Sequence, residues 1–237
     1  MHSPFVYNFI TKCLYDKTKH EAYTLIEAYR ETLQKSNTVI NVKDLGEGSK
    51  ALDTHERKVS AMVKTSSSSE KDTRILFRIA KYFQSKSILE LGTSLGMGTY
   101  AIAIASSSSN IITIEGCPNT SDFAKAKFHD LKLTNSKFFE GDFTSIIPVL
   151  KDPNFDLIFF DGHHNKAATL QYFESLLPKA HNETLFIFDD IYWSKGMTEA
   201  WESIKAHPLV TVTVDCFDLG FVFFRKEQVK EHFKIRV

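Results

Sequence analysis

The chain has 237 residues, of which 43% are hydrophobic and 24% are charged, so we expect a folded protein with a sizeable core. Lys and Arg together number 29, as do Asp and Glu, so no net charge favours nucleic acid or an anionic membrane, and a small-molecule partner is expected. The three cysteines (Cys13, Cys117 and Cys216) are far apart, which predicts reduced, mostly buried thiols in a cytoplasmic protein. No run approaches the ~18 apolar residues of a membrane span, and residues 1–13 lack the pattern of an export signal.

The first part of the chain is expected to be a helical extension. Residues 1–35 carry apolar side chains at steps of three and four, which predicts two amphipathic helices. Residues 36–58 are rich in charge and contain two glycines, which predicts a loop, and we expect 41–58 to be mobile until a ligand binds. We interpret residues 1–65 as an extension that serves as a lid or as the surface of a homodimer.

Residues 66–237 are expected to form the main domain. Serines 66–69 and Glu70 predict the start of a helix that runs to about Phe83. Beyond it, short apolar runs alternate with stretches long enough for helices, which is typical of a parallel sheet covered on both faces. The runs are 87–91, 111–114, 137–139, 155–160 and 184–188.

The end of the chain departs from this alternation. Residues 210–216 and 221–224 read as two strands of a hairpin, with a turn at 218–220. We therefore predict an α/β fold with a mostly parallel sheet of seven strands, helices on both faces, and an antiparallel last strand.

A glycine-containing turn follows the first of these strands and opens a helix. It contains Glu90, Gly92, Ser94 and Gly96, in the pattern Glu-x-Gly-x-x-x-Gly. A dinucleotide fingerprint would need glycine in place of Ser94, and a P-loop would need Gly-Lys-Ser or Gly-Lys-Thr, so both are excluded. Glycine at such a turn lets the backbone approach a ligand, and the free N–H groups of the helix face the same side.

Acidic residues end the next two strands. Glu115, 23 residues after Gly92, stands where a carboxylate in a nucleotide-binding unit takes both ribose hydroxyls, and Asp142 could accept from an adenine amino group. Each feature alone is also explained by an ordinary turn or a solvated acid. Together they favour a ligand at the carboxyl edge of the sheet.

This arrangement resembles the class I S-adenosylmethionine (SAM)-dependent methyltransferases, over roughly residues 66–225. The resemblance implies a Rossmann-like fold and SAM as the cofactor. It also implies roles for the matching residues. Gly92, Ser94 and Gly96 would line the methionine part of SAM, Glu90 would hold its amino group, Glu115 its ribose and Asp142 its adenine.

Three further carboxylates follow the fourth and fifth strands of the domain, namely Asp161, Asp189 and Asp190. Adjacent strands lie about 4.8 Å apart, so these side chains can converge. Carboxylates that close repel one another unless they are protonated or bridged, and an all-oxygen site suits Mg²⁺, Mn²⁺ or Ca²⁺. As helix or turn caps, the same residues would have no chemical role.

The three acids match the pattern of metal-dependent small-molecule O-methyltransferases, and the spelling Asp161-Gly-x-His164 resembles one broad group of them. The resemblance implies SAM-dependent O-methylation of a small hydroxylated acceptor, with a divalent cation activating the hydroxyl and Asp161 among the catalytic residues. His163 or His164 could be the general base. A non-catalytic SAM-binding regulatory module and a metal-independent methyltransferase using either histidine remain alternatives, and nothing suggests a nucleic-acid substrate.

Overall fold

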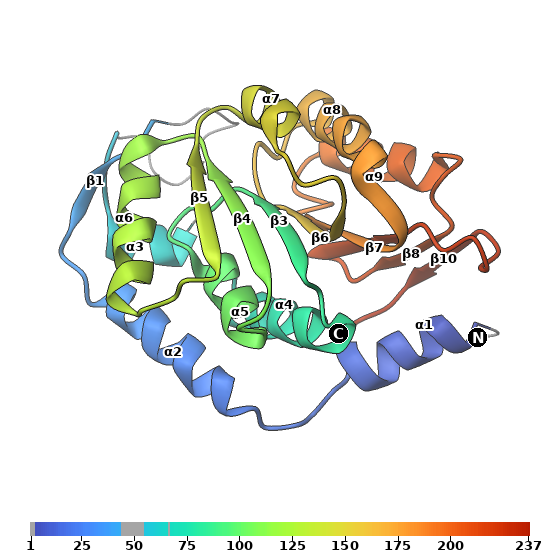
Figure 1. Ribbon diagram of the computed structural model, residues 1–237, viewed down its shortest axis with the longest axis horizontal. Helices are drawn as coiled ribbons and strands as arrows, with labels where there is room; N and C mark the ends of the chain where they lie inside the picture. Colours follow the sequence, from blue (N-terminus) through green and yellow to red (C-terminus); the bar gives the residue numbers. More distant parts are fainter. Residues whose placement is uncertain (1–2, 44–54, 66) are drawn as a thin grey trace.

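The computed structural model describes residues 3–43, 55–65 and 67–237. Eight strands form one sheet in the order β10-β8-β9-β7-β6-β3-β4-β5, with helices on both of its faces (Figure 1). Its strands are β3 Ser87–Leu91, β4 Asn110–Glu115, β5 Ser136–Glu140, β6 Phe155–Phe160, β7 Ala180–Asp189, β8 Val212–Asp215, β9 Leu219–Phe223 and β10 Glu231–Lys234.

The helices of the domain connect these strands. Within the described ranges, no helix is both long enough and apolar enough to cross a membrane. The helices are α4 Glu70–Phe83, α5 Met97–Ala105, α6 Pro118–Asp130, α7 Phe143–Ile146, α8 Lys166–Leu176 and α9 Lys195–Ala206, with the single turns η2 Ile147–Val149 and η3 Leu177–Lys179.

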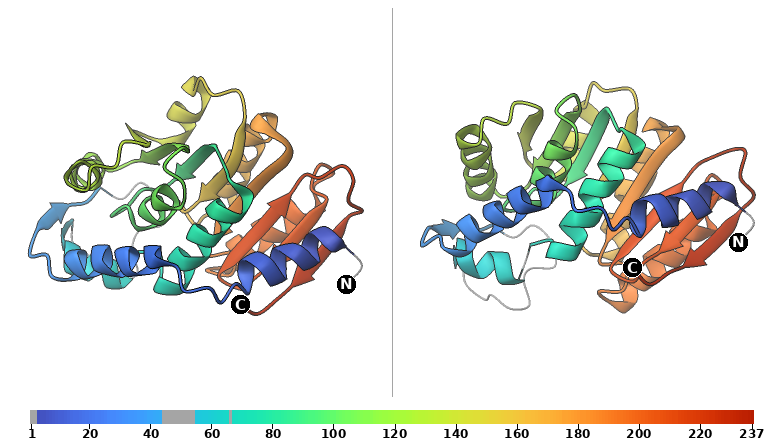
Figure 2. Two further views of the ribbon diagram at one scale, coloured as in Figure 1. Left: turned by 60° about the horizontal axis from the view of Figure 1, so that its bottom comes forward. Right: turned by 90° about the horizontal axis from the view of Figure 1, so that it is seen from below.

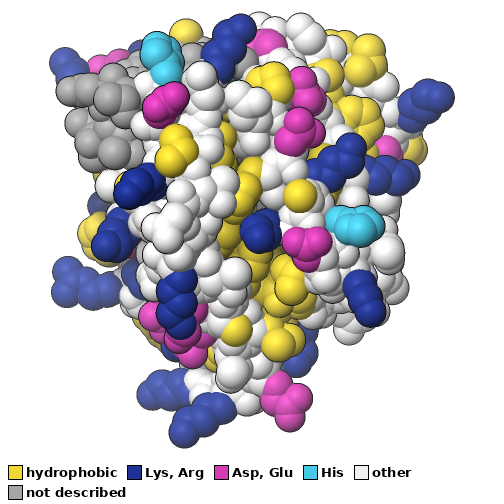
Figure 3. All heavy atoms as spheres, turned by 90° about the vertical axis from the view of Figure 1, so that its left-hand side faces the viewer, with side chains coloured by type: hydrophobic (Ala, Val, Ile, Leu, Met, Phe, Trp, Pro, Cys, Tyr) yellow, Lys and Arg dark blue, Asp and Glu magenta, His cyan; other side chains and the backbone are white. Residues whose placement is uncertain are grey.

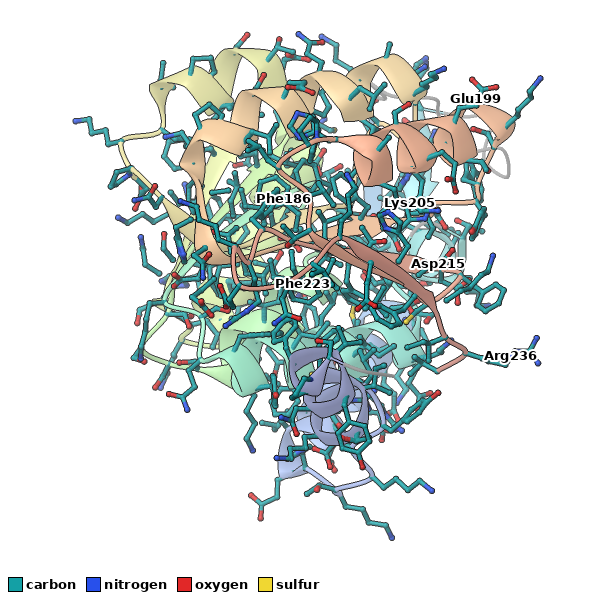
Figure 4. All side chains as sticks on the ribbon, turned by 90° about the vertical axis from the view of Figure 1, so that its right-hand side faces the viewer. Phe186, Glu199, Lys205, Asp215, Phe223 and Arg236 are labelled. Carbon is teal, nitrogen blue, oxygen red and sulfur yellow. The ribbon has the colours of Figure 1, made fainter. Side chains whose placement is uncertain are left out.

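The two faces of the sheet are buried in two separate cores. Phe186 points to the face covered by α8 and α9, whereas Phe223 points to the face covered by the N-terminal helices (Figure 4). All three cysteines are buried and free, as expected. Charges of both signs are interspersed over the face in Figure 3, in line with the balanced composition.

The predicted α/β sheet is confirmed, including its antiparallel strand, β9, which pairs with both β7 and β8. An eighth strand, β10, was not predicted. It pairs with β8 in parallel, but its four residues alternate between half-buried and exposed, so the sequence shows no apolar run there.

The N-terminal segment forms the two predicted helical regions, and it also contains a small sheet and a third helix. The two predicted regions are α1 Pro4–Phe9, which continues into the π-helical turn η1 Ile10–Leu14, and α2 Glu21–Gln34. The additional elements are a two-stranded antiparallel sheet, β1 Val39–Asn41 with β2 Glu56–Lys58, and the helix α3 Val59–Thr65. The predicted loop is therefore wrong at its two ends, which pair as strands, and its centre, 44–54, lies outside the described residues.

The N-terminal helices pack against the main domain rather than apart from it (Figure 2). The ring of Phe5 lies 4.9 Å from that of Phe223, and the ring of Phe9 lies 5.5 Å from that of Phe221. Farther along, the Tyr29 hydroxyl of α2 donates to the carbonyl of Leu95, at 2.7 Å. These contacts connect the extension to β9 and to the loop that follows β3.

The hairpin turn lies two residues earlier than predicted, because Gly220 belongs to β9 and pairs with Phe188 of β7. A Cβ atom at Gly220 would come within 2.8 Å of the Trp201 ring of α9. The glycine is therefore needed for a close approach of helix to strand, not for a turn.

We expect Gly220→Ala to lower the free energy of unfolding by about 1–3 kcal/mol, because the added methyl group has no room against the indole. Gly196→Ala is the matched control, since a Cβ there meets its nearest neighbour at an ordinary 3.5 Å. Urea unfolding of the two variants measures the difference. Equal stabilities would mean that Trp201 moves aside without cost.

Candidate active site

The residues singled out from the sequence lie at or just beyond the ends of strands at one edge of the sheet. The strands β3, β4, β5, β6 and β7 are parallel, so their carboxyl ends coincide (Figure 1). Open α/β sheets bind ligands at this edge.

The loop after β3 lies directly on the end of β6. Gly92 has φ +106°, and a Cβ atom there would lie 2.0 Å from the carbonyl oxygen of Asp161. The amide of Asp161 donates to the carbonyl of Leu91 at 2.9 Å. Glycine is therefore required at 92 by its backbone angle and by the contact with β6, in addition to any approach of a ligand.

Glu115 is held in place by two backbone N–H groups. The amide of Ser94 donates to one carboxylate oxygen at 2.8 Å, and the amide of Cys117 donates to the other at 2.9 Å. Ser94 itself has φ +48°, an uncommon angle for serine. The structure thus joins the end of β4 to the glycine loop and fixes the direction of the carboxylate.

Asp142 has a structural role that the sequence analysis did not consider. Its side chain caps α7 by accepting from the amide of Thr144 at 2.8 Å. Hydrogen bonds from Thr144 hold the pKa of Asp142 below its usual value. The carboxylate is therefore a fixed anionic acceptor at the end of β5.

Glu90 is fully buried beneath the loop. One of its oxygens accepts from the hydroxyls of Thr99 and Thr113, the latter at 2.6 Å. Burial raises the pKa of Glu90 to about 7, although these hydrogen bonds oppose the shift. Its other oxygen lies on the side of Gly98, where a Cβ would approach it to 2.8 Å.

Asp161 and Asp189 meet at the ends of β6 and β7, and His164 completes the group. One potential ligand atom from each of these three residues lies within 4.8 Å of the others. Burial raises the pKa of Asp189 to about 7 and that of Asp161 well above its usual value, and the charge of Asp189 adds to the shift of Asp161. Burial and the neighbouring charges thus disfavour the ionised forms of these carboxylates.

Asp190 lies next to this group, with φ +52° and its carboxylate 4.0 Å from His164 Nε2. Burial raises its pKa, an effect that His164 opposes. The predicted ligand set of Asp161, Asp189 and Asp190 stays a prediction, because the group found within 4.8 Å among the described residues contains His164 and not Asp190.

The capping alternative for these acids is excluded by the caps that the structure contains. Asn165 caps α8 by accepting from the amide of Ala167 at 3.0 Å, and Ser194 caps α9 by accepting from the amide of Met197 at 3.1 Å. The carboxylates of Asp161 and Asp189 are not used for either purpose.

The two adjacent histidines point to different neighbours. His163 has φ +64° and hydrogen-bonds through Nδ1 to the hydroxyl of Tyr172. His164 instead approaches Asp161, and its Nε2 atom lies 3.7 Å from the carboxylate. Of the two candidate bases, only His164 is placed beside the acids.

Residues from the N-terminal half also reach the site, although no sequence motif indicated this. The hydroxyl of Ser68 lies 3.4 Å from the Asp161 carboxylate, and the carbonyl of Ser68 accepts from Arg30 Nη2 at 2.6 Å. The charge of Asp72 contributes to the raised pKa values of Asp189 and Asp190. The serine run caps α4 through Ser69, as predicted, but it also contacts the acids.

Comparison with known families agrees with this geometry. Residues 89–191, which run from β3 to just beyond β7, match a family model described as a methyltransferase domain. This part of the chain is therefore similar to methyltransferase domains. No curated protein sequence matches the chain significantly.

Solved structures show the same fold over nearly the whole chain. A methyltransferase from Podospora anserina, bound to S-adenosylhomocysteine (SAH), is 14% identical, with a TM-score of 0.65 over 95% of this chain and 97% of that one. An O-methyltransferase from Bacillus cereus, in complex with SAH, is 18% identical, with a TM-score of 0.59 over 92% and 97%. The O-methyltransferase TomG from Streptomyces achromogenes, in complex with SAM, is 18% identical, with a TM-score of 0.61 over 88% and 91%.

The buried Glu90 predicts a pH dependence of stability. The pKa of Glu90 is raised in the folded state. At pH values between its usual pKa and about 7, the folded state therefore binds more protons than the unfolded state. Stability is therefore lost as the pH rises through this window. We expect Glu90→Gln to flatten the decline between pH 5 and 8 by on the order of 1 kcal/mol.

Chemical unfolding at several pH values tests this expectation, and the slope matters rather than the absolute stability. Glu31→Gln, on the exposed side of α2, is the control and should keep the slope of the wild type. Identical slopes for Glu90→Gln and the wild type would contradict the prediction.

Proposed function

We propose that this protein methylates a hydroxyl group of a small molecule, using SAM and a divalent cation. The observation that carries the proposal is the placement of Asp161, His164 and Asp189 at the same strand ends as Glu115 and the loop at Gly92. A cofactor site and a cation site would then lie side by side. The O-methyltransferases from Bacillus cereus and Streptomyces achromogenes share the fold.

For the cofactor, we propose the contacts expected from the family pattern. Glu115 is well suited to the ribose, because two amides hold its carboxylate in one direction at the end of β4. Asp142, ionised and fixed as a cap, suits the adenine amino group. Gly92, Ser94 and Gly96 would border the methionine part, and Glu90 would face its amino group from below the loop.

For the cation, the donor set fits. Two carboxylates with raised pKa values and an imidazole lie within bridging distance, and a cation would remove the repulsion between the acids. Oxygen donors suit Mg²⁺ and Mn²⁺, and an imidazole ligand favours Mn²⁺ over Ca²⁺. We propose Asp161, Asp189 and His164 as ligands, with Asp190 close enough to orient His164 or to join them.

The reaction then requires mainly positioning. SAM supplies a methyl group on a sulfonium sulfur, and a divalent cation lowers the pKa of a hydroxyl that it contacts. The chain's own residues hold the two reactants in line, and this contribution alone lowers a barrier by several kcal/mol. Glu115 and the loop fix one side of this geometry, and the ends of β6 and β7 fix the other.

The position of His164 keeps one alternative open. In a metal-independent enzyme, its Nε2 atom would accept the proton of the acceptor hydroxyl, since it lies beside Asp161, which could stabilise the resulting charge. His163 is less suited, because its Nδ1 atom is bonded to Tyr172. A non-catalytic regulatory role would leave the gathered acids without a purpose.

We further propose that residues 1–65 act as a cover on the 66–237 domain rather than as an independent unit. Two contacts support this: Tyr29 bonds to the loop before α5, and Arg30 bonds to the serine turn that touches Asp161. A cover so connected would exclude water from the reacting groups.

Replacing Glu115 by Ala should weaken SAH binding by about 10- to 100-fold, because a charge-assisted contact to the ribose is lost. Calorimetry with SAH measures this affinity. The control, Glu31→Ala, removes an exposed carboxylate that pairs with Lys35 and should bind SAH normally. Unchanged affinity in Glu115→Ala would refute the assignment of the ribose site.

The variants Asp189→Ala and His164→Ala should each lose Mn²⁺ binding, measured by electron paramagnetic resonance, while retaining SAH affinity within about threefold. Asp130→Ala, at the exposed end of α6, should bind Mn²⁺ as the wild type does. Chelation should also abolish methyl transfer, and Mn²⁺ should restore it. Full activity of metal-free protein would instead support His164 as a metal-independent base.

A further inference from the structure

A small cavity lies directly beside the proposed cation ligands, between the ends of β6 and β7 and the helices α8 and α9. It leaves about 10 Å³ for the centre of a water molecule. Phe160 and Phe188 form part of its apolar wall, whereas His164, Thr169 and Asp189 line it with polar groups. A cavity of about this size holds one water molecule if about two to four polar partners surround it, and a purely apolar cavity stays dry.

Thr169 of α8 directs its hydroxyl away from its own helix. Its side chain is buried, and the hydroxyl donates to the sulfur of Met197 in α9, at 3.5 Å. A threonine in a helix can instead donate to the carbonyl four residues earlier. Several threonines of this chain do so, namely Thr11, Thr32, Thr65, Thr73 and Thr198. Thr169 thus differs from them and faces the space between α8 and α9.

The bond to Met197 determines what Thr169 offers to the cavity. A thioether sulfur is a weak acceptor and never a donor, so the only hydroxyl proton of Thr169 points to Met197. The lone pairs of the hydroxyl oxygen remain for a donor in the cavity. A buried hydroxyl that has only a weak acceptor is poorly compensated for its loss of water, and a bound water molecule would remove this cost.

His164 has one ring nitrogen that can bond to the same water molecule. Its Nε2 atom lies 3.7 Å from the Asp161 carboxylate and 4.0 Å from that of Asp190. The Nδ1 atom points to the other side of the ring, and residues 3–43, 55–65 and 67–237 provide no hydrogen-bond partner for it. A histidine that binds a metal through one nitrogen donates the other N–H to a carboxylate, a carbonyl or a water molecule, which fixes its tautomer.

We infer that one ordered water molecule occupies this cavity, where it accepts from Nδ1–H of His164 and donates to Thr169, and that Thr169 is thereby a positioning residue for His164. The lone pair of Nε2 then faces Asp161 and the proposed cation. The second proton of the water is available to the Asp189 carboxylate, which also lines the cavity. The purpose of this arrangement rests on the proposed function, to which it adds the group that orients the histidine ligand.

The tautomer of His164 provides the first test, in protein from which metal has been removed. Long-range ¹H–¹⁵N correlation spectra distinguish the Nδ1–H and Nε2–H forms of a neutral imidazole, and His164→Ala assigns the signal. At about pH 8, above the ordinary histidine pKa of ~6.5, we expect the Nδ1–H form in the wild type. Thr169→Val, which replaces the hydroxyl by a methyl group, should reduce this form to less than half of the population. Thr169→Ser, which keeps a hydroxyl, should retain it.

Thr198→Val is the matched control. It removes a half-buried hydroxyl of α9 that donates to the carbonyl of Ser194 at 3.1 Å, and it should leave the tautomer of His164 unchanged. The Nε2–H form in the wild type, or the same tautomer in the wild type and in Thr169→Val, would overturn the inference.

A crystal structure of the wild-type chain, at a resolution that shows ordered waters, tests the water itself and does not depend on the folding of a variant. We expect density for one water molecule within hydrogen-bond distance of Thr169 Oγ1 and His164 Nδ1. A dry cavity, or a water that contacts neither atom, would refute the inference.

The positioning role is measured by electron paramagnetic resonance titration with Mn²⁺. Thr169→Val should weaken Mn²⁺ binding about 10- to 100-fold, because a histidine ligand loses its orienting partner, and Thr169→Ser should restore it. Unchanged SAH affinity in both variants would show that the fold is intact. Equal Mn²⁺ affinity in the wild type and in Thr169→Val would refute the role of Thr169. Failure of the wild type to bind Mn²⁺ would overturn the proposed cation site, and the tautomer and the crystal structure would then still decide whether the water is present.

Discussion

The contact of Gly92 with the backbone of Asp161 is the constraint on which the site depends. It brings the loop after β3, at which we propose that the cofactor binds, against the end of β6, where the cluster of acids begins. Any side chain at 92 would separate the two by more than an ångström, since a Cβ atom would lie 2.0 Å from a carbonyl oxygen. In-line transfer between two bound molecules tolerates little such displacement. A single glycine thus sets the distance between the two halves of the site.

Several acids gather at this edge, and the fold tolerates them by different means. Asp142 and Glu115 accept backbone amides, which stabilise their charge. Glu90 has only hydroxyl donors and is buried, so its pKa rises to about 7. Asp161 and Asp189 are buried, which raises the pKa of both, and the charge of Asp189 adds to the shift of Asp161. The ionised form of the carboxylates is therefore least favoured at the ends of β6 and β7, which is where we propose that the cation binds.

The sequence predicted the strands of the sheet well, because strands buried on both faces are apolar throughout, as in Phe155–Phe160. It missed β10, because a strand at the exposed edge of a sheet needs no apolar run. It also placed Gly220 in a turn, because the contact of this glycine with the Trp201 ring is a tertiary contact that leaves no local pattern. At the site, the acids were predictable because strand ends coincide. The opposite orientations of His163 and His164, and the approach of Ser68, depend on packing between distant segments and leave no local pattern.

Backbone strain is concentrated where the proposed chemistry is. Among the described residues, six other than glycine have a positive φ. Gln84 and Lys132 follow helices, where the left-handed conformation is common. The other four, Ser94, His163, Asp190 and Phe217, all lie in loops at the carboxyl edge of the sheet. Each such angle costs on the order of 1–3 kcal/mol and persists only because the surrounding structure enforces it. The packing of the two cores on either side of the sheet therefore provides the stability that keeps this edge in its strained conformation.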